Sequence, residues 1–222
     1  MTLAAAAVVA VGAPSAFAAV RGLFVVEVES APHRKLTRTV DGVRFTLEVP
    51  DTGWENGPHE KIGDTFRDHR LLISKSTVGP QGAEAIVFWA GLRGGGEATP
   101  CAKVLASAAD RSRSDLAATM ASAPGTKLVG GPSSVTVGGR PATRVALRVQ
   151  KDLGCDPGYF FTWPHGPRVL WGAFWPGTDV GDSIRVWIVD VGGKRLFFEA
   201  ETKPGHGLER EIGDIIRSIR FG

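Results

Sequence analysis

Residues 183–201 read SIRVWIVDVGGKRLFFEAE, and this stretch decides the fold. Its two halves are dominated by β-branched and aromatic residues, which predicts the strands Ser183–Val191 and Lys194–Glu201. Gly192-Gly193 between them is the signal of a tight hairpin turn. Such a turn fixes the antiparallel cross-strand partners, which are Val189 with Leu196, Trp187 with Phe198 and Asp190 with Arg195.

Further strands are expected on the N-terminal side of this hairpin. Residues 43–49 alternate apolar and polar side chains and stop at Pro50, as in a half-buried strand. A second hairpin signal, Gly138-Gly139, joins Val135 and Val137 to a returning strand from Arg140 to Gln150. Residues 54–70 are charged and aperiodic and predict a long loop. The remaining predicted strands are Leu71–Ser76, Ala83–Leu92, Tyr159–Trp163 and Arg168–Trp175.

Helical patterns occupy the middle and the end of the chain. Thr99-Pro100 opens an Ala-rich helix, and Ser114-Asp115 opens a second one that carries Leu116 and Met120 and stops at Pro124-Gly125. The C-terminal apolar residues recur at helical spacing and form one face. They are Leu208, Ile212, Ile215, Ile216 and Ile219. Hairpins and amphipathic helices together predict an α+β domain, a largely antiparallel β-sheet with flanking helices.

The N-terminal segment predicts export. Residues 1–20 carry no charge, and Ala16-Phe17-Ala18 matches the small-x-small pattern before a cleavage site. We therefore predict a signal peptide over 1–18 cleaved after Ala18, a linker over 19–34, a single α+β domain over 35–222, and a secreted or extracytoplasmic location. No Lys or Arg precedes the apolar run, so two alternatives stay open: at most a weak N-terminal membrane anchor, or a buried helix.

The chain has two cysteines, Cys101 and Cys155, and an even pair in an exported protein predicts one disulfide. None of the five histidines has a partner at structural-zinc spacing, so no metal site is predicted. A catalytic cysteine stays a minor alternative. The sequence lacks the Gly-x-Ser-x-Gly elbow, and Gly94-Gly95-Gly96 and Gly130-Gly131 lack a P-loop ending, so these glycines predict connectors and turns. We expect no catalytic residue and no cofactor.

Charge is distributed unevenly along the chain. The 222 residues are 43% hydrophobic and 22% charged, with a net charge of +3, which excludes a disordered chain and is too slight for a nucleic-acid-binding footprint. No acidic residue lies between Asp115 and Asp152, however, and Arg140, Arg144 and Arg148 share one strand face. Two interpretations stay open. The arginines form a patch for an anionic partner, such as a cell-wall polymer or an acidic protein, or they are a solvated strand side paired with Glu48, Glu199 or Glu201.

Three smaller sets of residues also have two interpretations each. Asp179 and Asp182 suit either a calcium ion or ordinary turn hydrogen bonds. Glu199 and Glu201 share a strand face and are either a pair of glycosidase-type carboxylates or an exposed polar side. Trp163 and Trp175 stand at strand ends as a candidate aromatic surface for sugar rings, whereas Trp187 is expected in the core.

Two motifs carry a resemblance to a known family. Residues 154–163 read GCDPGYFFTW and residues 181–190 read GDSIRVWIVD. With Glu199-Ala200-Glu201-Thr202 and the closing helix, they resemble a family of exported actinobacterial domains over about 35–221. The predicted order of elements is similar to the PsbP-like α/β sandwich. The resemblance implies an accessory or binding role and supplies no catalytic residues.

The sequence therefore predicts an exported accessory or binding domain of the cell envelope, without a catalytic site, whose partner is an envelope polymer or protein. Two alternatives remain: a cell-envelope hydrolase that uses carboxylates, and a structural domain of a larger envelope assembly. The hydrolase requires Glu199, Glu201 and an aspartate to meet in a pocket. The structural domain requires a contiguous exposed apolar patch.

Overall fold

A computed structural model describes residues 32–56, 61–62, 65–66, 72–76, 84–91, 112–151, 180–203 and 207–222. The chain from Ala31 to Gly222 forms one compact unit. The first described strand begins at His33, so it includes two residues that the sequence assigned to the linker. The predicted signal peptide, the predicted helix at Thr99-Pro100 and the strands expected over 159–163 and 168–175 lie outside the described residues.

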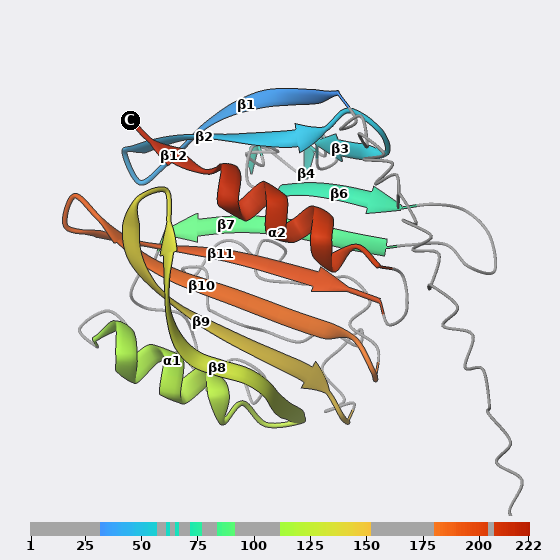
Figure 1. Cartoon of the computed structure of the whole chain (residues 1–222), viewed down its shortest axis with the longest axis vertical. Coiled ribbons are helices and arrows are strands. Elements are labelled where there is room, and N and C mark those ends of the chain that lie inside the picture. Colours follow the sequence, from blue (N-terminus) through green and yellow to red (C-terminus); the bar gives the residue numbers. More distant parts are fainter. Residues whose placement is uncertain are drawn as a thin grey trace, which may run out of the picture. The chain divides into compact units, whose positions relative to one another are not determined.

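A seven-stranded sheet dominates the fold, and we call it the large sheet (Figure 1). Every described pairing in it is antiparallel. This confirms the predicted largely antiparallel sheet. In spatial order its strands are β3 (Trp54–Asn56), β6 (Leu72–Ser76), β7 (Glu84–Gly91), β11 (Lys194–Thr202), β10 (Ser183–Val191), β9 (Arg140–Val149) and β8 (Thr126–Val137).

The hairpin at Gly192-Gly193 forms as predicted. In β10 and β11, Val189 lies opposite Leu196, Trp187 opposite Phe198 and Asp190 opposite Arg195. Gly192 and Gly193 both have positive φ angles, which a tight two-residue turn of this hand requires. The Asp190 and Arg195 side chains form an ion pair with Oδ1 and Nε 2.7 Å apart. A local turn signal thus fixed the register of the central strands.

A smaller three-stranded sheet contains β1 (His33–Val40), β2 (Val43–Pro50) and β12 (Arg220–Phe221). β2 is the predicted alternating strand, but β1 and β12 were not predicted. A separate ladder joins β4 (Lys61–Ile62) and β5 (Thr65–Phe66). The long loop predicted over 54–70 is therefore wrong at three short strands, β3, β4 and β5. These strands are too short to show a periodic pattern, and each exists through its pairing with another segment.

Among the described residues, two helices flank the large sheet. α1 (Arg113–Ala121) begins one residue before the predicted start, because the Ser112 hydroxyl caps it by accepting a hydrogen bond from the Asp115 N–H at 3.1 Å. α2 (Glu209–Ser218) is the predicted C-terminal helix. All five residues of its predicted apolar face are buried, which confirms the helical period read from the sequence. No described helix has the length and apolar character needed to cross a membrane.

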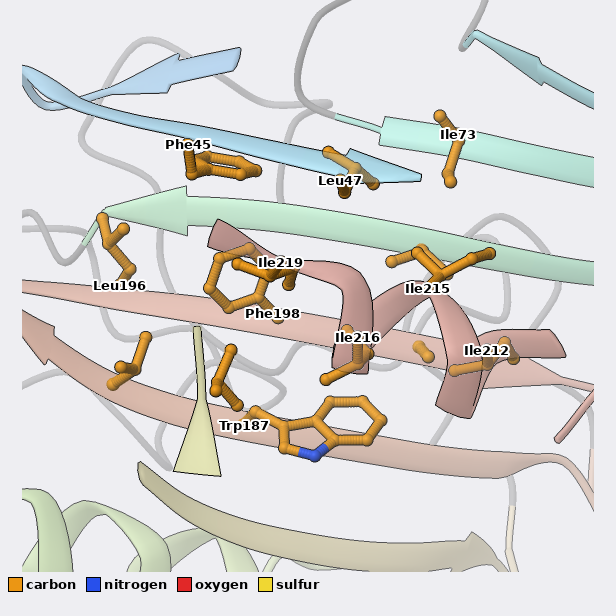
Figure 2. Close-up of a cluster of buried hydrophobic side chains, with 14 of the residues drawn as sticks. Phe45, Leu47, Ile73, Trp187, Leu196, Phe198, Ile212, Ile215, Ile216 and Ile219 are labelled. Carbon is orange, nitrogen blue, oxygen red and sulfur yellow. The ribbon is translucent and has the colours of Figure 1, made fainter. Parts of the chain in front are cut away.

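The two faces of the large sheet carry separate cores. On one, which we call the α2 face, the α2 isoleucines pack over Trp187 and Phe198 beside Phe45 and Leu47 of β2 (Figure 2). On the other, the α1 face, Leu116 and Met120 of α1 pack over residues of β9, β10 and β11. Neighbouring residues of β11 therefore belong to different cores, because Phe198 faces α2 and Phe197 faces α1.

Candidate functional site

The α2 face carries a cluster of cations beyond the edge of its apolar core. In β9 and β10, Ala146 lies opposite Arg185, and Ala146 is flanked on the same face by Arg144 and Arg148, two residues away on either side. Arg148 lies opposite Ser183 in β10 and opposite Lys127 in β8. The alternation of side chains across a sheet therefore puts four cations on one face. We call this group, Lys127, Arg144, Arg148 and Arg185, the arginine surface.

Only one carboxylate is ion-paired to these four cations among the described residues. Glu209 Oε1, in the first turn of α2, lies 3.4 Å from Arg185 Nη2. Burial lowers the pKa of Arg185, the charge of Glu209 raises it, and the positive charge of Arg144 lowers it again. Two guanidinium groups thus lie close enough to repel each other. Arg144 Nε is buried with no hydrogen-bond partner in the part of the chain that the structure describes.

The three arginines of the predicted patch lie on one face of β9, and the arginine surface differs from that patch in three residues. Arg140 lies on the same face as Arg144, but it stands beside the Gly138-Gly139 turn, opposite Val137, and is six residues from Ala146, the β9 residue opposite Arg185. Arg185 of β10 and Lys127 of β8, which the predicted patch did not include, lie beside Arg144 and Arg148. The sequence pattern did indicate the face on which Arg185 lies, because Arg185 and Trp187 are two residues apart on β10 and alternate with apolar residues of the other face.

The alternative pairing of these arginines with Glu199 or Glu201 is wrong. Glu199 lies opposite Val186 and Glu201 opposite Ile184, and both of those partners belong to the core on the α1 face. The two glutamates therefore point away from the arginine surface. Glu48 stands on β2 in the small sheet, where its backbone N–H donates to the Ser218 hydroxyl.

Glu199 and Glu201 are also not an exposed polar side. Their exposed fractions are 0% and 6%, and that of Asp182 is 0%. Asp182 shares a hydrogen bond with Glu201, and Lys203 Nζ lies 3.6 Å from Asp182 Oδ2. We call Asp182, Glu199 and Glu201 the buried acidic cluster. Apolar cores cover both faces of β11. The alternation along the strand does not show this, so the burial of its glutamates could not be predicted from the sequence.

Burial raises the pKa of Glu201 to about 9. The hydrogen bond to Asp182 and the negative charges of Asp182 and Glu199 raise the pKa in the same direction, while the charge of Lys203 lowers it. Glu201 is therefore protonated at neutral pH and donates to Asp182. Among the described residues, no three His, Cys, Asp or Glu side chains are placed so that they could hold a metal ion.

The other candidate residues have different outcomes. Trp187 is 7% exposed and belongs to the core on the α2 face, as predicted. Asp182 points into the protein, and its partner in the calcium interpretation, Asp179, lies outside the described residues. The same holds for the predicted disulfide between Cys101 and Cys155 and for the aromatic candidates Trp163 and Trp175.

Comparison with known proteins returns weak similarities. No family model matches the chain, and no curated protein matches it. LpqN, which is involved in cell envelope biogenesis of Mycobacterium tuberculosis, has a TM-score of 0.43 at 12% identity, covering 85% of this chain and 91% of its own. Cyanobacterial PsbP from Synechocystis has a TM-score of 0.44 at 12% identity, covering 88% and 96%. A protein from Pseudomonas aeruginosa described as a putative regulator has a TM-score of 0.39 at 13% identity, covering 83% and 95%. Similarity at this level does not establish a family, so the PsbP-like sandwich stays a prediction.

Proposed function

We propose that this chain is an exported accessory or binding domain of the cell envelope, without a catalytic site, and that it binds an anionic envelope polymer on the arginine surface. The observation that supports binding is the imbalance of charge on the arginine surface: among the described residues, one carboxylate, that of Glu209, is ion-paired to its four cations. Export rests on the signal-peptide pattern of residues 1–18.

An anion would complete the electrostatics of this face. Arg144 and Arg185 are close like charges, and Arg144 has an unused buried donor. Buried donors without partners cost free energy, and arginine binds oxyanions through charge-assisted hydrogen bonds. Arg148 and Lys127 are exposed at the rim of the same face, where they are available to further charges along a polymer. Binding should weaken as salt screens the rim charges.

The test is co-sedimentation of the full chain with isolated cell-wall material over a range of salt concentrations. We expect Arg144→Gln/Arg148→Gln to weaken binding by at least about tenfold, the effect of losing one charge-assisted hydrogen bond. The matched control is Arg44→Gln/Arg217→Gln, which removes the same net charge at two exposed positions outside the arginine surface. Equal losses in the two double variants would mean that only net charge matters, and no loss in either would refute the proposed surface.

The hydrolase is a second candidate because Asp182 and Glu199 lie close enough to Glu201 for their charges to raise its pKa, although that alternative also requires the three carboxyl groups to line a pocket. A protonated glutamate beside further carboxyl groups is a pattern found in general acid catalysis. However, none of the three side chains is more than 6% exposed. The hydrolase requires release of soluble fragments from cell walls by the wild type and loss of that release in Glu201→Gln.

A structural domain of a larger assembly is the third candidate and has less support. It calls for a contiguous apolar surface. Among the described residues, three large apolar side chains are exposed, and two of them, Leu128 and Val129, are neighbours on β8.

A further inference from the structure

We propose that the arginine surface is a phosphate-binding site, in which one phosphate group is held among Arg144, Arg148 and Arg185 above a floor of small residues. The inference rests on the proposed function and names the ligand class for the same surface. The floor consists of Gly130, Ala146 and Ser183.

The strand register arranges the three arginines as a triangle. Arg144 and Arg148 are four residues apart on β9, and Arg185 lies on β10 beside the position midway between them. Diagonal positions of neighbouring strands are roughly 7–8 Å apart at Cα, within the reach of arginine side chains. All three guanidinium groups can therefore approach one ligand from different sides.

The floor residues have little or no side chain, so the Arg144 guanidinium group can lie against the backbone between the strands. Gly130 shows this most directly: a Cβ there would lie 3.4 Å from Arg144 Nη2 and 3.5 Å from Ala146 Cβ. The end of the Arg144 side chain thus lies close to the Gly130 backbone. Gly130 stands where β8 departs from regular register, between Leu128 and Ser133, so the expected turn at Gly130-Gly131 is an irregularity within a strand.

The charges make an empty site unfavourable and a filled one favourable. Arg144 and Arg185 repel each other, and the single carboxylate, Glu209, is ion-paired to Arg185. Arg144 Nε has no hydrogen-bond partner among the described residues. An anion between Arg144 and Arg185 would offset the repulsion and accept from the unused donor.

The number and geometry of the donors favour phosphate over carboxylate. A carboxylate has two oxygens and is satisfied by the fork of one arginine. A phosphate group presents more acceptor oxygens in a tetrahedral arrangement, so several guanidinium groups can bind it together. Three converging arginines therefore suit a phosphate group, whether it belongs to a polymer or to a lipid headgroup.

The experiment compares two soluble polyanions of equal charge, a synthetic glycerol phosphate polymer and polyglutamate, by isothermal titration with the full chain. We expect the phosphate polymer to bind at least about tenfold more tightly, a difference of one charge-assisted hydrogen bond. Inorganic phosphate should displace the polymer at lower concentration than acetate does.

A parallel titration uses phosphatidylglycerol vesicles with phosphatidylcholine vesicles as control. Tighter binding of the vesicles assigns the phosphate to a lipid, and tighter binding of the polymer assigns it to a glycopolymer.

Charge-conserving variants separate phosphate coordination from simple attraction. Arg144→Lys and Arg148→Lys keep the positive charge but lose the planar fork. Each should lower the affinity for the phosphate polymer severalfold and leave that for polyglutamate unchanged. Because Arg148 is exposed, Arg148→Lys does not disturb the core.

Two results would overturn the inference, and they differ in whether the proposed anion-binding function is refuted with it. Equal affinity of the wild type for both polymers would refute the phosphate site while the proposed anion-binding function survives. No binding of either polymer, or of the vesicles, would refute both.

Discussion

At the scale of single residues, Glu201 links the pH of the surroundings to the stability of the fold. Its carboxyl group has an ordinary pKa of 4.5 and a pKa of about 9 in the folded chain, so between these values the folded state holds a proton that the unfolded state has lost. The free energy of unfolding therefore falls as pH rises through this window, with a slope of up to about 1.4 kcal/mol per pH unit from this group.

Glu201→Gln should remove this slope, because the amide stays neutral and still donates to Asp182. We expect the variant to be more stable than the wild type at pH 8 and to lose that advantage towards pH 5. Urea unfolding at a series of pH values measures the difference. The control is Glu55→Gln at an exposed position of β3, which should keep the wild-type slope. An unchanged slope in Glu201→Gln would show that Glu201 is ionised in the folded chain.

At the scale of elements, one carboxylate ties α2 to the edge of the large sheet. Glu211 Oε2 accepts from Trp54 Nε1 of β3 at 2.8 Å, and Lys75 Nζ of β6 lies 2.8 Å from the same oxygen. The Lys75 side chain is 13% exposed, so removing its partner leaves a largely buried ammonium group unpaired.

We expect Glu211→Ala to lower the free energy of unfolding by about 1–2 kcal/mol, a value reduced for the partial exposure of Glu211. Glu211→Gln should cost less, since its amide oxygen still accepts from Trp54. The control on the same helix is Asp214→Ala, which breaks the exposed pair with Arg217 and should cost under about 0.5 kcal/mol. Urea midpoints rank the three variants. Equal losses in the free energy of unfolding for Glu211→Ala and Asp214→Ala would show that the contacts of Glu211 contribute no more than an exposed ion pair.

The elements that the sequence predicted are those with local signals. The hairpin at Gly192-Gly193, the alternation in β2 and the isoleucine spacing of α2 each lie within about twenty residues. β12 has two residues and exists because Phe45 and Thr46, far away in the chain, pair with it. The buried acidic cluster was missed for a related reason: whether Glu199 is exposed depends on what covers its face of the sheet, which the β11 pattern does not record.

At the scale of the whole molecule, the two cores share one sheet and should unfold together. Phe197 and Phe198 are consecutive residues of β11, yet one packs with α1 and the other with α2. Loosening β9, β10 and β11 on one face therefore removes the support of the other face. Separate unfolding of the α1 side would require the central strands to stay intact without their apolar cover.

Leu116→Ala tests this coupling from the side away from Trp54 and Trp187, the two tryptophans whose side chains the structure describes. Leu116 of α1 is fully buried, so truncation should lower the free energy of unfolding by about 2–5 kcal/mol. Trp54 and Trp187 are buried in the other core and contribute to tryptophan fluorescence. We expect fluorescence and far-UV circular dichroism to shift to the same lower urea midpoint, as in a two-state transition.

Ile212→Ala on α2 is the mirror variant and should behave alike. If fluorescence kept its wild-type midpoint in Leu116→Ala while the dichroism shifted, the α1 side would be an independent folding unit, because the loss of its core would then leave the packing around Trp187 intact.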